Sequence, residues 1–113
     1  RIREIGNQVS GIVADWLDFF FKHHAELGWN GSPLHDPCAV AVLMRPEIFT
    51  TQEMYVEIDT EGHYTRGATI ADWHQSSGNP NNVTAVLGVD RDKFVDLLVE
   101  VCKTYEGRKV DIA

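Results

Sequence analysis

The chain has 113 residues, of which 43% are hydrophobic and 24% are charged, a composition typical of one folded globular domain. Its seventeen acidic and ten basic residues give a formal net charge of -7, and the basic residues are scattered along the sequence. This charge excludes nucleic acid and anionic membrane surfaces as expected partners.

The segment from Ser10 to Leu27 predicts an amphipathic helix, because its apolar residues recur at three- and four-residue spacing with charged residues between them. We expect Ser10 to cap its start, and Gly28 to end it in a left-handed conformation. The apolar positions of this pattern are Ile12, Val13, Trp16, Leu17, Phe20 and Phe21.

The next segment, from Pro37 to Met44, is apolar at every position and predicts a short helix that is buried on all sides. Asp36 followed by Pro37 is a typical helix start, because the carboxylate can accept hydrogen bonds from free backbone N–H groups. Pro46 should stop this helix.

Alternating patterns then predict strands in residues 53–59 and 63–72, with Glu61-Gly62 as a hairpin turn between them. In the second strand, Tyr64, Arg66, Ala68 and Ile70 should share one side. Residues 73–82 have the composition of a polar loop. Residues 83–89 alternate again and predict a third strand.

Asp90 should cap a last helix that ends near residues 105–107. Its apolar face is predicted to consist of Phe94, Leu97, Leu98, Val101 and Cys102. The neighbouring acids Asp90 and Asp92 therefore indicate a helix start, although their spacing could also suggest a catalytic acid cluster.

The two cysteines, Cys38 and Cys102, lie in apolar runs without a CxxC motif, so we expect buried thiols in a reducing compartment. No apolar run approaches the roughly 18 residues of a membrane span, and the first residues do not resemble a signal peptide. These features together predict a cytoplasmic protein.

Most histidines lack metal-ligand spacing. His23 and His24 are adjacent on the predicted first helix and point about 100° apart, so they cannot chelate one ion together. His63 lies beside a turn and His74 in a polar loop. A small histidine-based zinc protein is therefore not favoured, whereas contact of His23 or His24 with a ligand stays open.

His35-Asp36-Pro37 is the strongest candidate site in the residues alone. A carboxylate at a helix start beside an imidazole can hold a metal or a substrate hydroxyl next to a proton donor. The alternative is that Asp36 simply caps the helix and His35 is a loop residue. The two interpretations are compatible.

An ordered set of short motifs makes the site more specific. The set comprises SPLHDP at 32–37, FTT at 49–51, TRG at 65–67 and VDRDKF at 89–94. HDP alone would be a weak signal. On this set, and from the first helix to the last, the chain closely resembles the C-terminal part of the inosine-uridine-preferring nucleoside hydrolases.

The resemblance implies an N-glycosidase of ribonucleosides with an α/β three-layer fold, of which this piece would show helices and a small, mostly antiparallel sheet. It places a calcium ligand and ribose contact on Asp36 and the acid that assists the leaving base on His35. Calcium is a hard cation that prefers carboxylate oxygen, and a proton donor near the base lowers the barrier.

The family's acid-rich motif DxDxGxDD, which the resemblance associates with the other calcium ligands, does not occur in this sequence. We therefore expect residues 1–113 to be the C-terminal fragment of a nucleoside hydrolase domain, inactive alone and without bound calcium. A homo-oligomer is expected. The alternative is a non-catalytic interaction or oligomerisation module built on the same scaffold.

Overall fold

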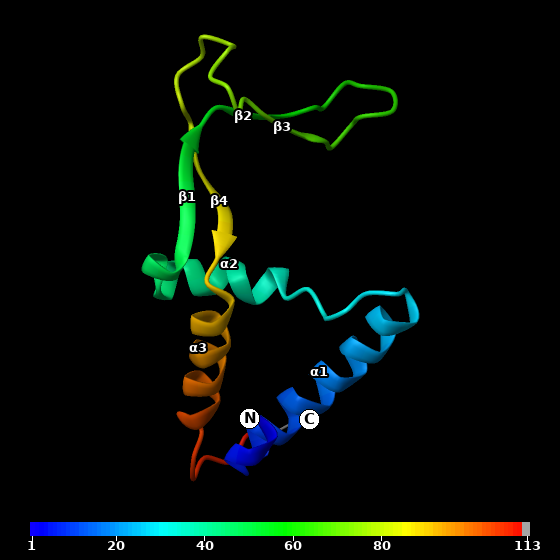
Figure 1. The fold of residues 1–113 in the computed structure, drawn as a ribbon, viewed down its shortest axis with the longest axis vertical. Coiled ribbons are helices and arrows are strands. Elements are labelled where there is room, and N and C mark those ends of the chain that lie inside the picture. Colours follow the sequence, from blue (N-terminus) through cyan, green and yellow to red (C-terminus); the bar gives the residue numbers. More distant parts are fainter. Residues whose placement is uncertain (112–113) are drawn as a thin grey trace. The chain divides into compact units, whose positions relative to one another are not determined.

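The computed structural model describes residues 1–111, which form two compact units. One unit joins Arg1–Ile48 to the chain from Asp90 onward and contains the helices (Figure 1). The other, Phe49–Val89, contains the strands. The helices are α1 (Gln8–Glu26), α2 (His35–Met44) and α3 (Arg91–Lys103), with 3-10 turns η1 (Arg3–Ile5) and η2 (Pro46–Ile48).

Helix α1 begins two residues before the predicted start, because Asn7 and not Ser10 is its cap. The Asn7 side chain accepts a hydrogen bond from the Ser10 amide at 2.8 Å and donates one to the Cys102 carbonyl at 2.8 Å. Ser10 is fully buried and its hydroxyl donates to the Asn7 carbonyl. The expected Ser10 cap was wrong, and Asn7 also ties the start of α1 to the end of α3.

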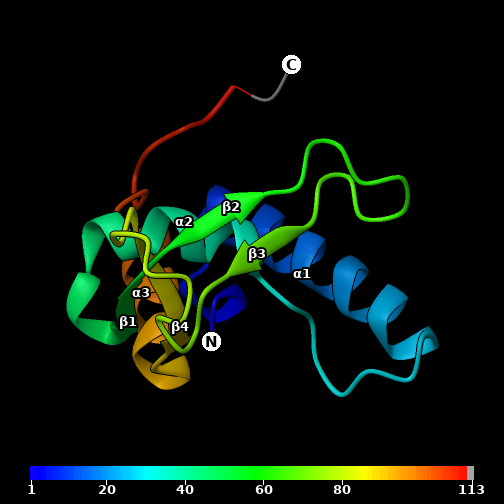
Figure 2. The ribbon, with the colours of Figure 1, turned by 90° about the horizontal axis from the view of Figure 1, so that it is seen from above.

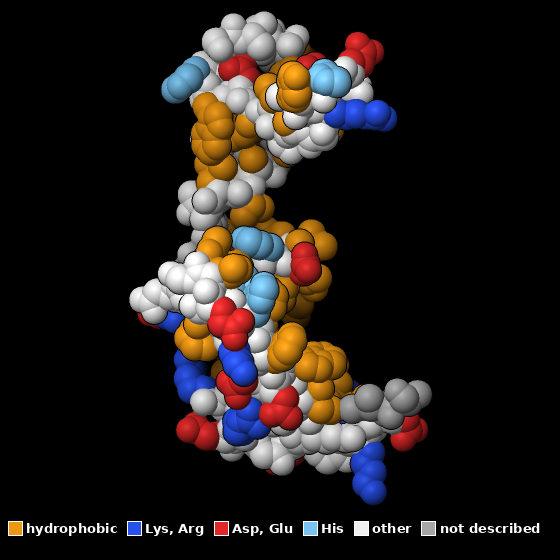
Figure 3. Space-filling view, turned by 90° about the vertical axis from the view of Figure 1, so that its right-hand side faces the viewer, with side chains coloured by type: hydrophobic (Ala, Val, Ile, Leu, Met, Phe, Trp, Pro, Cys, Tyr) orange, Lys and Arg blue, Asp and Glu red, His pale blue; other side chains and the backbone are white. Residues whose placement is uncertain are grey.

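Helix α1 ends as predicted at Gly28, whose φ of 81° is in the left-handed region. The Gly28 amide donates to the Ala25 carbonyl and the Trp29 amide donates to the His24 carbonyl, so two of the free carbonyls of the last turn are satisfied. From Asp15 onward α1 is largely exposed, including Trp16 and Phe19. Figure 3 views the side of the molecule on which α1 lies and shows hydrophobic side chains on its surface.

Helix α2 differs from its prediction in two ways. It starts at His35, so Leu34 occupies the cap position and Asp36 lies inside the first turn. Only Ala41 is buried, whereas Leu43 is 84% exposed. The prediction that this helix is buried on all sides was wrong for the described chain. Helix α2 packs mainly against η2 and α3, and most of its side chains are exposed or half-buried.

Helix α3 starts as predicted. The Asp90 carboxylate accepts a hydrogen bond from the Lys93 amide at 3.2 Å and pairs with the Lys93 ammonium at 3.3 Å. These interactions lower the pKa of Asp90. Along α3 the buried residues are Phe94, Leu97, Val99 and Cys102. The predicted face is confirmed for three of these, while Leu98 and Val101 are half-buried.

The strand unit consists of two antiparallel pairs. Strand β1 (Phe49–Met54) pairs with β4 (Val83–Val89), and β2 (Val56–Ile58) pairs with β3 (Thr69–Ala71). Figure 2 shows β2 and β3 side by side, with the long loop that joins them. The third predicted strand is confirmed as β4, and its pairing with β1 was not foreseen.

The predicted hairpin is confirmed by the pairing of β2 with β3, but its turn is not a tight one at Glu61-Gly62, because the Asp59 carboxylate holds a longer loop. It accepts hydrogen bonds from the Glu61 and Gly62 amides at 3.0 and 2.8 Å and from the Thr65 hydroxyl. Tyr64 is therefore in a loop rather than in a strand and is 93% exposed. Asx turns of this kind replace the regular strand ladder.

Two further side chains order the strand unit. Asp72 accepts hydrogen bonds from the Ser76 and Ser77 amides at 3.0 and 2.9 Å, which lowers its pKa. Asn82 uses both ends of its amide on Val56, accepting from its N–H at 2.8 Å and donating to its carbonyl at 3.0 Å. The polar segment 73–82 is thus a loop, as predicted, with anchored ends.

Helices with small antiparallel sheets confirm the fold class expected for the piece itself. Within residues 1–111, no helix is both long enough and apolar enough to cross a membrane.

Candidate functional site

The candidate site is the first turn of α2, where His35 and Asp36 are the first two helical residues. The chain reaches this turn through a loop that contains Gly31, whose φ of 138° is a conformation that other residues rarely adopt. The Cys38 amide donates to the Leu34 carbonyl at 3.3 Å and closes the first turn. Adjacent helical residues point about 100° apart, so the imidazole and the carboxylate leave the turn in different directions.

Both side chains are exposed. Within the described part of the chain, neither forms a hydrogen bond or ion pair, in contrast to Asp90. The partial positive charge of a helix start favours a carboxylate in the first turn. Asp36 therefore stands where a negative charge is tolerated, and no neighbour in the described chain occupies its oxygens.

Calcium, which the family resemblance implies, takes roughly 6–8 oxygen ligands. Asp36 is suited to such a site by chemistry, but one carboxylate supplies at most two oxygens. Within residues 1–111, no group of three or more His, Cys, Asp or Glu side chains could hold a metal ion. The described residues alone do not fit a calcium site.

Of the two histidines of α1, His24 is less available than His35. A ring nitrogen of His24 lies 2.9 Å from the Phe20 carbonyl one turn earlier. The His24 ring also contacts the Phe20 and Trp29 rings edge-on, at centroid distances of 4.3 and 5.8 Å. His24 is thus held by its own helix and the turn that follows. Contact of His23 or His24 with a ligand stays a prediction.

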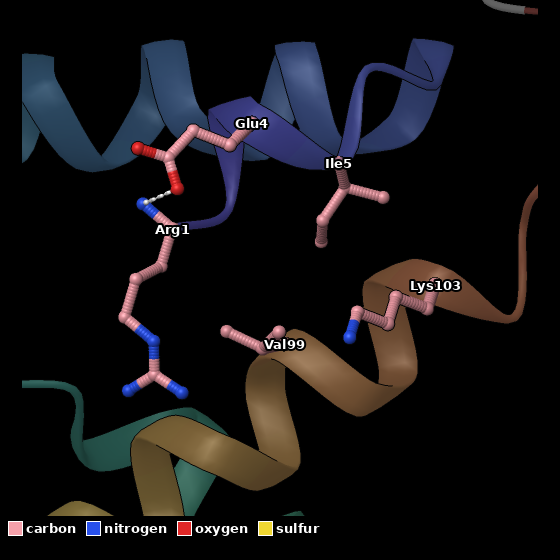
Figure 4. Close-up of a pocket in the computed structure, with 5 residues that line it drawn as sticks. All are labelled: Arg1, Glu4, Ile5, Val99 and Lys103. Atoms are coloured by element: carbon pink, nitrogen blue, oxygen red, sulfur yellow. Dashed lines mark ion pairs between the residues drawn. The ribbon is translucent and has the colours of Figure 1, made fainter.

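Two hollows elsewhere lack the chemistry of the candidate site. One, of 290 Å³, lies between η1 and α3 (Figure 4). Its only carboxylate, Glu4, pairs with the Arg1 amino group at 3.4 Å. The other, of 330 Å³, lies in the strand unit and is bordered by Tyr55, Glu57 and Asp72. Tyr55 donates a hydrogen bond to Glu57, and Asp72 accepts one from the Ser76 amide. These groups therefore already have structural partners.

The cysteines are not part of a reaction site. Cys102 is buried and Cys38 is half-buried, and both are free thiols. Burial raises the pKa of both thiols, which makes them poor nucleophiles. The expectation of two buried thiols was right for Cys102 and only partly right for Cys38, since α2 is covered on one side only.

Sequence reasoning missed three side chains that organise local structure in the two units. Asn7, Asp59 and Asp72 each accept backbone hydrogen bonds, and their residue types are the ones that form caps and Asx turns. It could not tell which side of α2 is exposed, because an all-apolar helix gives no signal of direction.

Comparison with known proteins identifies one matching family and several similar sequences. The profile of the family described as "Inosine-uridine preferring nucleoside hydrolase" matches residues 1–96. The chain is 50% identical over 107 residues to the pyrimidine-specific ribonucleoside hydrolase RihA of Salmonella typhi, covering 93% of this chain and 34% of that protein. With RihA of Klebsiella pneumoniae (strain 342) the identity is 53% over 102 residues, covering 88% and 33%.

Among solved structures, a purine-preferring ribonucleoside hydrolase from Gardnerella vaginalis matches with a TM-score of 0.71 at 29% identity. The match covers 91% of this chain and 34% of that one. The described structure therefore corresponds to part of a ribonucleoside hydrolase fold. The chain spans about a third of the length of the relatives that it matches.

Proposed function

The chain belongs to the inosine-uridine preferring nucleoside hydrolase family, and from this premise we propose that it supplies His35 and Asp36 to a ribonucleoside hydrolase active site. The reaction is hydrolysis of the N-glycosidic bond, which releases ribose and the free base. One observation carries the proposal. These two side chains are adjacent and exposed in the first turn of α2, and the described fold uses neither of them.

The two residues suit different parts of the reaction. Cleavage of the N-glycosidic bond builds positive charge on the ribose and negative charge on the departing base. The Asp36 carboxylate accepts hydrogen bonds from ribose hydroxyls and holds the sugar. The His35 imidazole delivers a proton to the base as it leaves, and such general acids contribute typically about 10²–10⁴-fold in rate.

In this proposal, calcium would be bound by a larger site of which Asp36 forms only a part. Asp36 is suited to be one of its ligands, with the other oxygens contributed by residues outside these 113. The described residues do not form such a site, so no chemical step is assigned to the metal.

We propose that residues 1–113 act as one part of a nucleoside hydrolase domain and are inactive alone. The similarity to about a third of each relative supports this division. Pyrimidine ribonucleosides are the proposed substrates, because the relatives at 50–53% identity are named pyrimidine-specific, whereas the purine-preferring structure is 29% identical. Homo-oligomerisation and a cytoplasmic location stay predictions.

The rival proposal is a non-catalytic interaction module. Such a module should have a polar surface where the remaining part of a hydrolase fold would dock, because a unit that works without that part has no reason to keep an apolar surface there. The exposure of Trp16, Phe19 and Leu43, at 68%, 77% and 84%, favours a piece that needs covering. The enzyme part is therefore the preferred proposal.

A chimera tests the proposed function. In RihA of Escherichia coli O7:K1, the third that matches is exchanged for this chain, with which it is 50% identical over 107 residues. Release of uracil from uridine and of hypoxanthine from inosine is then measured. The proposal expects uridine turnover, a fall of about 10²–10⁴-fold in His35→Ala, and loss of turnover in Asp36→Ala. Full activity of both variants would contradict the assigned roles.

A further inference from the structure

Helix α2 carries Asp36 on the same face as three large apolar residues. Positions 36, 40, 43 and 44 follow the i, i+4, i+7, i+8 spacing that brings helical side chains to one side. The apolar members are Val40, Leu43 and Met44, and together they are called the α2 stripe.

The α2 stripe is open to solvent in the described chain. Its residues are 59%, 84% and 47% exposed, whereas Ala41, about 100° around the helix from Val40, is 4% exposed. The main contacts of α2 within the described residues are with η2 and α3. Exposed apolar side chains that form a continuous stripe are typical of an interaction surface rather than of a finished exterior.

The similar proteins indicate what covers the stripe. The Gardnerella structure reproduces this chain with a TM-score of 0.71 over only 34% of its own length, and the RihA relatives match over about the same share. Each relative thus carries roughly twice as much additional polypeptide beside the same third. A cover of that size is available in the family, and the exposed stripe needs one.

We propose that the α2 stripe docks onto the part of a nucleoside hydrolase fold that lies outside the matched third, and that this docking encloses Asp36 at the edge of the contact. The inference rests on the proposed function and adds positioning residues to it. Val40, Leu43 and Met44 do not touch the substrate. They fix the first turn of α2 against the rest of the enzyme and remove water from the surroundings of the Asp36 carboxylate.

This arrangement gives the stripe a catalytic consequence. Hydrogen bonds from ribose hydroxyls to a carboxylate are stronger where water is excluded. A small displacement of a group that holds the substrate can also lower turnover strongly, by as much as about 10²-fold. Loosening the stripe should therefore reduce turnover even in protein that remains folded.

The test uses the RihA chimera with substitutions at Leu43, the most exposed residue of the stripe. Leu43→Ala should lower kcat/KM for uridine by about tenfold at a temperature well below its melting point. Leu43→Asp should lower the Tm by roughly 5–10 °C, because it places a charge in the docked contact. Leu43→Met, which keeps the volume and apolar character, should leave kcat/KM and Tm close to those of the parent chimera.

The same Leu43→Asp substitution in the 113-residue chain is the matched control. There it should leave the Tm unchanged, since the side chain is already in water. Equal kcat/KM and Tm for Leu43→Ala, Leu43→Asp and the parent chimera would overturn the inference. So would an insoluble chimera, because the stripe would then not accept its partner. Dimerisation of the isolated chain that Leu43→Asp abolishes, with no effect in the chimera, would assign the stripe to self-association and overturn it too.

Failure of the proposed function would look different. A chimera whose Tm responds to Leu43→Asp but that releases no base from uridine or inosine would retain the docking surface and refute the enzymatic assignment. A chimera that is active and depends on Asp36, yet is indifferent to Leu43, would retain the function and refute the docking.

Discussion

Two helices of this chain begin beside an aspartate, and the fold uses only one of these carboxylates. At α3, Asp90 accepts the Lys93 amide and pairs with the Lys93 side chain. At α2, Asp36 lies one position inside the first turn and is exposed. The same sequence signal, an aspartate at a helix start, thus marks a structural cap in one case and a carboxylate available for a ligand in the other.

The burial of the two helices beyond their first turns differs in the same way. Helix α3 buries Phe94 and Leu97, whereas α2 leaves Val40 and Leu43 in water. The more apolar helix is thus the less covered one. Helix α3 is already packed in the described chain, whereas α2, which carries the candidate site, is exposed on the side of that site.

Truncation of core side chains should give the largest difference between the two helices. Phe94→Ala is expected to lower the free energy of unfolding by about 3–5 kcal/mol, because it leaves a cavity beside α3. Leu43→Ala in the same chain should change it by less than about 0.5 kcal/mol. Urea denaturation of the 113-residue chain measures both. Comparable losses would mean that α2 is covered in solution.

Replacing each aspartate by alanine compares the two helix starts directly. Asp90→Ala removes a cap and should lower the Tm of the 113-residue chain by roughly 4–8 °C. Asp36→Ala removes no hydrogen bond of the described fold and should leave the Tm within about 1 °C. Thermal unfolding followed by circular dichroism gives both values. A larger effect at Asp36 would indicate a structural partner for its carboxylate.

Acid should weaken the regions held by carboxylates. Hydrogen bonds lower the pKa of Asp59, Asp72 and Asp90 from the ordinary value of 3.8. The unfolded chain therefore binds these protons more readily than the folded one. Their contribution is complete above about pH 5 and is lost as the pH falls through 3.8 and below. The Tm should drop over this range, and less steeply in Asp72→Asn. A Tm independent of pH between 5 and 3 would contradict this.

Thiol reactivity should report the coverage of the two helices with the smallest perturbation. Cys38 on α2 is half-buried and Cys102 on α3 is 5% exposed. A thiol-specific reagent added to the native chain should modify Cys38 faster, on the order of tenfold. Cys38→Ser should leave only the slow reaction. Modification of both thiols at one rate would show that α3 is no better covered than α2.

Local patterns were enough to predict the elements that satisfy themselves within a few residues. The Asp90 cap and the Gly28 terminus needed only neighbours in sequence, and the alternating pattern was enough to locate strand β4. The β1–β4 pairing and the Asp59 loop were not predicted, because they depend on contacts across longer segments and on side-chain hydrogen bonds. Periodicity cannot indicate which side of an apolar helix is covered, so the exposed side of α2 was not predicted either.

For the candidate site, too, the sequence predicted the residues but not their geometry. The residue types at 35 and 36, together with the SPLHDP motif, singled out His35 and Asp36 as candidates, and their roles stay a prediction. Its capping geometry was mispredicted, because a shift of one residue in the helix start moves Asp36 from the cap into the first turn. The shift frees the carboxylate and so strengthens the functional interpretation.

The most direct test of the central claim is uridine hydrolysis by the RihA chimera in two matched variants, Asp36→Asn and Asp90→Asn. Each substitution removes one charge and preserves the shape of the side chain, and asparagine still caps a helix. The account predicts that Asp36→Asn abolishes uracil release with little change in Tm, whereas Asp90→Asn retains it. Equal turnover in both variants would contradict the account and leave Asp36 as an ordinary residue of a helix start.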